Sequence, residues 1–259
     1  MQQAKNLGTN QVQLIRAEHG IEREESIFLA DEVPVSLTFN GLSHAVLMAT
    51  PSDLMELMLG FSLSEGIVDA PKQIYETSVI QHEQGYEVSA QISSERFAKL
   101  KERRRNLRGA TGCGLCGVEA LASSALQIPR VTRYPVTLKQ ILKGFEELTS
   151  RQPLNQLSGA LHAAGWLSSE GLSAVFEDVG RHNALDKLIG WRALNQPTAQ
   201  GAVLMTSRVS YELVQKCAQA QIGTLCAVSA PTSLATQLVI QSGMGLGVFA
   251  RGSRISWIN

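Results

Sequence analysis

The sequence lacks three features that would place it in a specialised class of protein. It has no excess charge, because 23 basic residues balance 23 acidic ones, so no overall field draws it to nucleic acid or to an anionic membrane. It has no apolar run of membrane-spanning length, and its first residues are polar where a signal peptide would be apolar. Four cysteines are too few for a disulfide framework. We therefore expect a cytoplasmic protein with reduced thiols that binds neither nucleic acid nor membrane.

Two of the cysteines, Cys113 and Cys116, lie in a glycine-rich segment over residues 109–117. Glycine permits many backbone conformations, so we expect a mobile loop. A helical pattern begins at Val118, and arginines precede the loop at positions 103, 104, 105 and 108. A helix N-terminus and nearby cations both favour a thiolate over a thiol, although the arginines could also be an ordinary solvated helix face. The pattern predicts a reactive pair of thiols on a moving arm.

The first half of the chain is expected to mix strands and helices. Strands are predicted over residues 12–15, 33–39, 44–48, 77–81 and 86–92. Asn40-Gly41 is a strong signal for a hairpin turn because both residues tolerate positive φ angles. Thr50 is predicted to cap a helix that has Pro51 at its first position and ends at Gly66. Another helix is expected from about residue 94 to the cysteine loop.

The second half of the chain alternates strands with helices. Strands are predicted over residues 160–167, 172–179, 202–205, 224–228 and 246–250, and helices over 138–148, 182–191, 210–220 and 231–241. This alternation implies parallel pairing and a sheet covered by helices. We therefore predict an α/β protein in which an α+β N-terminal domain, residues 1–134 with the cysteine loop, precedes a three-layer α/β domain, residues 135–259.

Four loops of the second half carry residue types that are rare in a core. The loops that leave the carboxyl ends of parallel strands gather at one edge of a sheet, where ligands bind. Arginines, hydroxyls and free helix N-termini at that edge would suit phosphate, so we expect a ligand that carries phosphate or a nucleotide. The candidate residues are Arg181, His182, Ser207, Arg208, Ser229, Thr232, Phe249, Ala250, Arg251, Gly252, Ser253 and Arg254.

Several of these candidates also suit ordinary structural roles. Helix capping alone would account for the hydroxyls of Ser210, Ser229 and Thr232. Arg181 could form an ion pair with Asp178 or Asp186. His182 could be a hydrogen-bonded helix residue.

The cysteine pair does not match the common zinc or redox motifs. Structural zinc needs four ligands, but Cys217 and Cys226 fall in a predicted helix and strand and are expected to be buried core thiols. A zinc nucleobase deaminase would show His-x-Glu and Pro-Cys-x-x-Cys; no His-x-Glu exists here, and Gly112 replaces the proline. A thioredoxin-type pair would accompany an early βαβ unit. We therefore expect no metal. The remaining interpretation of the cysteine pair is that it carries sulfur as a persulfide, although an isolated Cys-x-x-Cys has many uses.

One run of the sequence is long and chemically unusual: Glu-Asp-Val-Gly-Arg-His-Asn-Ala-Leu-Asp-Lys, residues 177–187. Together with other segments spread over nearly the whole chain, it resembles the formate dehydrogenase accessory sulfurtransferase (FdhD) family. The other segments are residues 32–35, 40–41, 44, 48–54, 59–67, 112–117, 161–164, 208–216, 228–234 and 249–252.

The resemblance implies a sulfurtransferase that takes sulfur from a cysteine desulfurase onto Cys113, with Cys116 as its helper. The sulfur would pass to the bis-molybdopterin guanine dinucleotide cofactor that formate dehydrogenase requires. The resemblance also implies a homodimer, a cytidine-deaminase-like C-terminal fold without zinc chemistry, and a nucleotide site that includes residues 249–254. The rival hypotheses are a cofactor-binding chaperone for formate dehydrogenase without sulfur chemistry and a zinc hydrolase on a deaminase-type fold.

Overall fold

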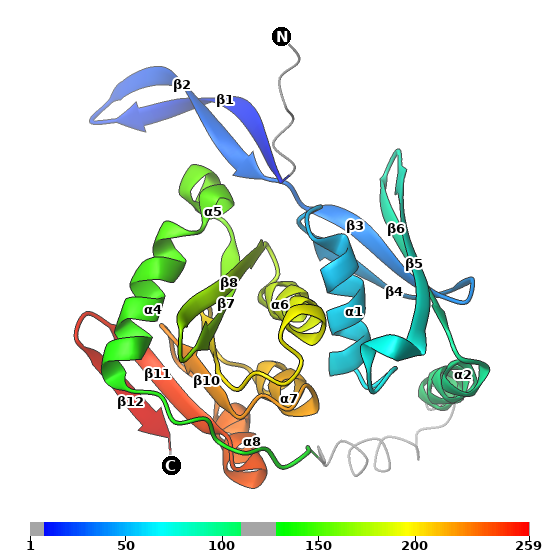
Figure 1. Ribbon diagram of the computed structural model, residues 1–259. Coiled ribbons are helices and arrows are strands. Elements are labelled where there is room, and N and C mark those ends of the chain that lie inside the picture. The colour runs from blue at the N-terminus through cyan, green and yellow to red at the C-terminus, as the bar shows by residue number, and fades with distance from the viewer. Residues whose placement is uncertain (1–7, 110–127, 259) are drawn as a thin grey trace.

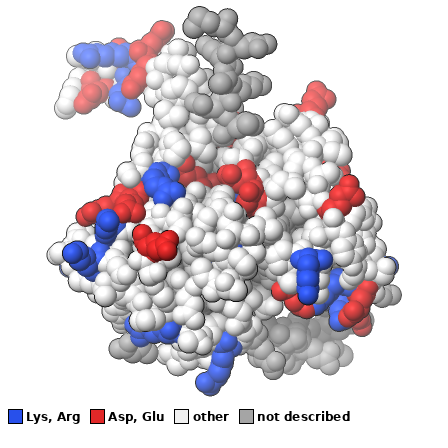
Figure 2. Space-filling view, in the orientation of Figure 1, with Lys and Arg blue, Asp and Glu red and all other residues white. Residues whose placement is uncertain are grey.

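Three β-sheets and their surrounding helices make up the described structure (Figure 1). The computed structural model describes residues 8–109 and 128–258, without the side chains of residues 104–109. Charged side chains of both signs are spread over the face seen in Figure 2, and neither sign dominates it. No helix among these residues combines the length and the apolar character needed to cross a membrane.

The chain begins with a two-stranded hairpin that projects from the rest of the molecule (Figure 1). Strands β1 (Thr9–Glu18) and β2 (Ile21–Ala30) pair along their full length, so the strand predicted over residues 12–15 is present but much longer than expected. Most side chains of both strands are exposed, and the sequence therefore lacks the alternation that marks a half-buried strand. The overlooked signal is the turn His19-Gly20, with φ angles of 52° and 79°.

The second sheet has four strands in the order β4-β3-β6-β5. They are β3 (Val33–Phe39), β4 (Leu42–Ala49), β5 (Ile74–His82) and β6 (Gly85–Ile92). Helix α1 (Leu54–Ser64) packs its apolar side on this sheet, and the 3-10 helix η1 (Pro71–Gln73) and helix α2 (Ser94–Gly109) complete the unit. The predicted turn at Asn40-Gly41 is confirmed by φ angles of 47° and 79°.

The start of α1 differs from the prediction. The helix begins at Leu54, and its N-cap is Asp53, whose φ angle of 52° is left-handed. Thr50 is buried and caps nothing: its backbone N–H donates to Asp178 Oδ2 at 3.1 Å, and its hydroxyl accepts from the Val179 N–H at 3.2 Å. Thr50 therefore joins the second sheet to the third.

The third sheet has six strands in the order β12-β11-β10-β9-β7-β8. They are β7 (His162–Ser168), β8 (Gly171–Asp178), β9 (Ala202–Met205), β10 (Thr224–Ala227), β11 (Gly245–Arg251) and β12 (Arg254–Ile258). β9, β10 and β11 are parallel neighbours, while β7 and β12 run antiparallel to the strands beside them. β12 and the short helix α5 (Pro153–Ser158) are elements that the sequence pattern does not predict.

Helices cover both faces of the third sheet (Figure 1). Helices α6 (Arg181–Asn195), α7 (Tyr211–Gln219) and α8 (Ser233–Ser242) bury one face, and α4 (Leu138–Ser150) buries the other. The result is three layers, with the main core between the sheet and the group α6, α7 and α8.

Two glycines let α1 and α6 approach each other until their backbones touch. A Cβ atom on Gly60 of α1 would overlap the carbonyl of Asp186 in α6. A Cβ atom on Gly190 of α6 would overlap the carbonyl of Glu56 in α1. Because the backbone atoms of a packed helix cannot move aside cheaply, any side chain at these two positions would separate the helices.

The fully buried ammonium group of Lys187 stabilises one end of the contact between α1 and α6. Its Nζ atom pairs with the Asp178 carboxylate at 2.7 Å and donates to the carbonyls of Thr50 at 3.1 Å and Glu177 at 3.2 Å. Asp178 also accepts from the side-chain amide of Asn183 at 2.9 Å. The charge of Lys187 thus holds together the end of β8, the first turns of α6 and the loop after β4.

A second lysine, Lys216 of α7, closes the other end of the contact. Its Nζ atom lies 2.7 Å from Glu65 and 2.9 Å from Asp186, and it donates to the Ser64 hydroxyl at 3.0 Å. Burial alone would lower the pKa of Lys216, but the two carboxylates outweigh it and raise the pKa. The amine therefore stays charged and links α1, α6 and α7.

We predict that Gly60→Ala will lower the free energy of unfolding by about 3 kcal/mol, because the new methyl group meets backbone that cannot yield. Urea unfolding followed by circular dichroism measures this. Gly144→Ala in α4 is the matched control, since its Cβ would meet only the ends of side chains, Leu204 at 2.7 Å and Leu167 at 3.3 Å, and alanine favours the helix. An equal loss of stability in the two variants would contradict the close contact of α1 and α6.

Candidate anion-binding site

Four loops meet at the edge of the third sheet where its parallel strands end. They follow β8, β9, β10 and β11, as the sequence predicts. Backbone hydrogen bonds join three of them: Val209 N–H to Ala230 O at 3.1 Å, Thr232 N–H to Val209 O at 2.9 Å, and Phe249 N–H to Ser229 O at 3.4 Å. This edge is a connected surface, and the candidate ligand residues lie on it.

Three basic side chains gather at one point of the edge: His162, Arg181 and Arg208. His162 begins β7 and faces Asp178 at the end of β8, while the adjacent Ala163 bonds with Thr206 after β9. Burial lowers the pKa of His162, and the charges of Arg181 and Arg208 lower it further, although Asp178 opposes them. Together the three residues form a group of donors for an anion.

Arg181 is the member of this group that most needs a partner. Its Nε atom is buried and has no hydrogen-bond partner among the residues that the structure describes. The proposed ion pairs with Asp178 and Asp186 do not form, because these carboxylates pair with Lys187 and Lys216. A buried guanidinium donor without a partner is costly, and a bound oxyanion would satisfy it.

His182 has a partner of its own. Its Nε2 atom lies 2.8 Å from Glu212 and 3.4 Å from the Ser210 hydroxyl, both at the start of α7. Burial lowers the pKa of His182, and the charges of Arg181 and Lys216 act in the same direction against Glu212. The structural alternative is therefore the better account of this histidine, which helps to hold α6 beside α7.

Two of the candidate hydroxyls, those of Thr232 and Ser207, are engaged in local bonds. Thr232 caps α8 by accepting from the Ala235 N–H at 3.3 Å, which confirms the capping alternative for this residue. Ser207 is buried, and its hydroxyl donates to the Arg208 carbonyl at 2.9 Å. The edge therefore offers an anion its basic side chains more than its hydroxyls.

The last predicted loop, residues 249–254, turns from β11 into β12. Phe249 has a left-handed φ angle of 55° at an irregular point of the strand pairing, and 46% of its surface is exposed. A non-glycine residue in this conformation is strained, and such strain often occurs where a side chain is aimed at a ligand. Arg251 donates from Nε to the Val228 carbonyl at 3.1 Å, while Gly252, Ser253 and Arg254 are exposed.

The cysteines fall into two groups. Cys113 and Cys116 lie outside the described residues. Cys217 and Cys226 are buried, as predicted, and burial raises the pKa of each to about 12. Within the described part of the chain, no three His, Cys, Asp or Glu side chains are placed to hold a metal ion.

The cysteine segment is residues 110–127, which hold Cys113 and Cys116, and the chain that follows it lies at the opposite edge of the third sheet. After residue 128 the chain runs past the end of α8, where the Val131 N–H donates to the Ser242 carbonyl at 2.9 Å. The Tyr134 N–H then donates to the Thr224 hydroxyl, at the start of β10, at 2.9 Å. The anion site and the entry to the cysteine segment are thus separated by the length of the parallel strands.

His162 is the site residue that the sequence reasoning misses. It lies in the matched segment Leu161-His162-Ala163-Ala164, in a strand predicted from residue 160. A polar residue at the start of a strand that forms a hairpin with β8 must lie where β8 ends. The pairing of β7 with β8 was therefore the signal that could have placed His162 at the site.

Comparison with known proteins finds a matching family and similar sequences. The sequence model of the FdhD/NarQ family matches residues 30–257. The protein named sulfur carrier protein FdhD in Acinetobacter baylyi is 48% identical over 229 residues, which cover 87% of this chain and 84% of that protein. The protein of the same name in Cupriavidus necator is 49% identical over 227 residues, covering 86% of this chain and 78% of that protein.

A solved structure shares the fold. It is described as a putative formate dehydrogenase accessory protein from Desulfotalea psychrophila, and it matches with a TM-score of 0.75 over 97% of both chains. Its sequence is 24% identical, so it supports the arrangement of sheets and helices and nothing finer.

We predict that His162 has a pKa below 6.5 in the free protein and that sulfate raises it, because an anion favours the protonated ring. His162 is then neutral at pH 7 and takes up a proton on binding, so sulfate affinity should rise as the pH falls from 7 toward the free-state pKa. Histidine NMR titration measures both effects. Arg208→Gln should raise the free pKa of His162, whereas Arg254→Gln should leave it unchanged. A sulfate-independent pKa would contradict the anion site.

Proposed function

The chain belongs to the FdhD/NarQ family, and from this premise we propose that it is a sulfur carrier in the maturation of formate dehydrogenase. Relatives that are 46–49% identical over most of their length are named sulfur carrier protein FdhD. The observation that carries the proposal to this chain is the basic group His162, Arg181 and Arg208, in which one buried donor of Arg181 has no described partner. A sulfur carrier that serves a nucleotide-bearing cofactor needs such a site.

Sulfur is carried on Cys113, with Cys116 as its helper. The two remaining cysteines are unsuitable because burial raises the pKa of each to about 12, and a thiol is nucleophilic only as a thiolate. The Cys113 thiolate attacks the outer sulfur of a persulfide on a cysteine desulfurase. A new S–S bond forms on Cys113, the S–S bond of the donor breaks, and the donor leaves as a thiolate. The outer sulfur keeps its proton, so no oxidant or reductant is required.

The cargo is the bis-molybdopterin guanine dinucleotide cofactor, which is the substrate of the second transfer. Its phosphates suit Arg181, Arg208 and a protonated His162. The exposed ring of Phe249 is available to stack on a guanine base, and Arg251 and Arg254 are further cations beside it. Formate dehydrogenase then receives the cofactor in sulfurated form.

The fold and setting follow from the same proposal. We assign the C-terminal sheet to the cytidine-deaminase type, which its strand order β8-β7-β9-β10-β11 supports. We divide the domains at residue 134, and residues 131–134 already contact the third sheet and the end of α8. We further propose that the protein acts as a homodimer in the cytoplasm.

We predict that incubation with a cysteine desulfurase and cysteine adds the mass of one sulfur atom to the protein, and that a reductant removes it. Cys113→Ala should abolish the gain, because it removes the acceptor, while Cys226→Ala should leave it intact because that thiol is buried. Intact-protein mass spectrometry measures the gain. Equal loading of Cys113→Ala would refute the assignment of the carrier, and active formate dehydrogenase formed with that variant would favour the chaperone hypothesis.

We predict that Arg181→Gln weakens GDP binding about ten-fold or more, because a charge-assisted hydrogen bond contributes roughly 1.5–3 kcal/mol. Isothermal titration calorimetry at fixed salt measures the dissociation constant. Arg16→Gln, on the projecting hairpin, is the control for a lost positive charge and should bind GDP normally. Equal affinities in all three proteins would contradict the placement of the nucleotide.

A further inference from the structure

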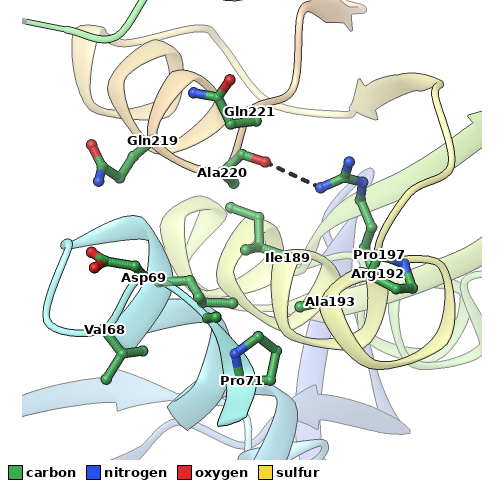
Figure 3. Close-up of a pocket in the computed structure, with 12 residues that line it drawn as sticks. Val68, Asp69, Pro71, Ile189, Arg192, Ala193, Pro197, Gln219, Ala220 and Gln221 are labelled. Carbon is green, nitrogen blue, oxygen red and sulfur yellow. Dashed lines mark hydrogen bonds between the residues drawn. The ribbon is translucent and has the colours of Figure 1, made fainter. Parts of the chain in front are cut away.

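Two adjacent hollows lie at the edge where the parallel strands begin, and Arg192 and Gln221 line both of them; we call the pair the groove. The larger has a volume of about 320 Å³ and lies between the end of α1, the turn before η1 and the ends of α6 and α7 (Figure 3). The smaller has a volume of about 240 Å³ and continues the groove past Trp166 to Thr132 and Tyr134.

The larger hollow of the groove has an apolar floor. In the larger hollow this floor is formed by Leu63, Val68, Pro71, Ile189, Ala193 and Ala220. Arg192 separates the two hollows: its terminal nitrogens donate to the carbonyls of Ala220 at 3.1 Å and Ala199 at 3.3 Å, and its guanidinium lies 4.9 Å from the centre of the Trp166 ring. The floor suits an apolar side chain of a partner more than a charged small molecule.

The rim of the groove is positive. Arg192 lies between the two hollows, and Lys72 follows Pro71, which lines the larger one. Arg103 lies beside Gly66 and donates to its carbonyl at 3.4 Å. The one acid of the lining, Asp69, is already paired with Arg96. An acidic partner therefore fits the rim.

The groove lies between the two described ends of the cysteine segment. On one side, Arg103 of α2 also bonds to the Glu65 carbonyl at 3.2 Å, and α2 ends at Gly109, about 9 Å further along the helix. On the other side, Thr132 and Tyr134 line the smaller hollow, a few residues after the chain resumes at residue 128. A protein seated in the groove would touch the chain just before and just after the segment that holds Cys113.

We propose that this groove docks the sulfur-donating protein through an apolar side chain on an acidic segment. The inference rests on the proposed function, since a carrier must bring its thiolate to the persulfide of the donor. The basic group at the opposite edge is left free for the cargo, so donor and cargo do not compete for one surface.

The test compares Ala193→Trp, which fills the larger hollow, with Gln237→Trp, which adds the same side chain to the exposed face of α8 away from the groove. The full-length protein is assayed for its dissociation constant with a cysteine desulfurase by biolayer interferometry. Loading of Cys113 is followed by mass spectrometry with two sulfur sources, the desulfurase with cysteine and inorganic polysulfide. A third readout is GDP affinity.

Ala193→Trp should weaken desulfurase binding at least ten-fold and slow desulfurase-driven loading to a similar degree, while polysulfide loading and GDP affinity stay at wild-type values. Gln237→Trp should match the wild type throughout. Wild-type desulfurase affinity in Ala193→Trp would overturn the proposal. An equal fall in loading from both sulfur sources would also overturn it, since the hollow would then serve the protein's own cysteine segment. Desulfurase binding that depends on the groove, in a wild-type protein that takes sulfur from neither source, would support docking and contradict the sulfur-carrier function.

Discussion

The structure depends on two buried lysines, which hold the second sheet and its helix α1 against the third sheet and its helices α6 and α7. Lys187 of α6 bonds to the end of β8 and the loop after β4, and Lys216 of α7 bonds to the end of α1 and to Asp186 of α6. Both lie beside a contact between α1 and α6 that glycines keep too tight for side chains. Removing one partner from such a buried pair costs about 3–5 kcal/mol, because the remaining charge is left in the interior. The same bonds fix the loop after Asp178, so the position of Arg181 at the sheet edge depends on this packing.

This arrangement separates two kinds of chemistry by the length of a sheet. The basic group lies where β8 and β9 end, and the chain that follows the cysteine segment lies where β10 begins and α8 ends. Each edge has its own character, since one presents arginines and a histidine, and the other a groove whose larger hollow has an apolar floor and a positive rim. A carrier that receives sulfur from one protein and serves a bulky cofactor gains from this division, because the donor protein and the cofactor can be bound at the same time.

Elements with a clear apolar pattern could be predicted closely: β3 alternates along most of its length, and β9 is a short continuous apolar run typical of a buried strand. The loops at the sheet edge could be grouped because the carboxyl ends of parallel strands lie at one edge of a sheet. The role of Thr50, and of Asp178 and Asp186, could not, because each is set by a partner more than 25 residues away in the chain. Most of the paired strands β1 and β2 escaped because both of their faces are largely exposed, and His162 escaped because its importance comes from the register of β7.

The central claim is that the carboxyl edge of the third sheet receives the nucleotide end of the cargo. A crystal structure of the protein with GDP tests it most directly. The account predicts that the phosphates lie within hydrogen-bonding distance of Arg181, including its Nε atom, with the His162 and Arg208 side chains beside them. GDP bound in the groove at Arg192, or anywhere else away from this edge, would contradict it.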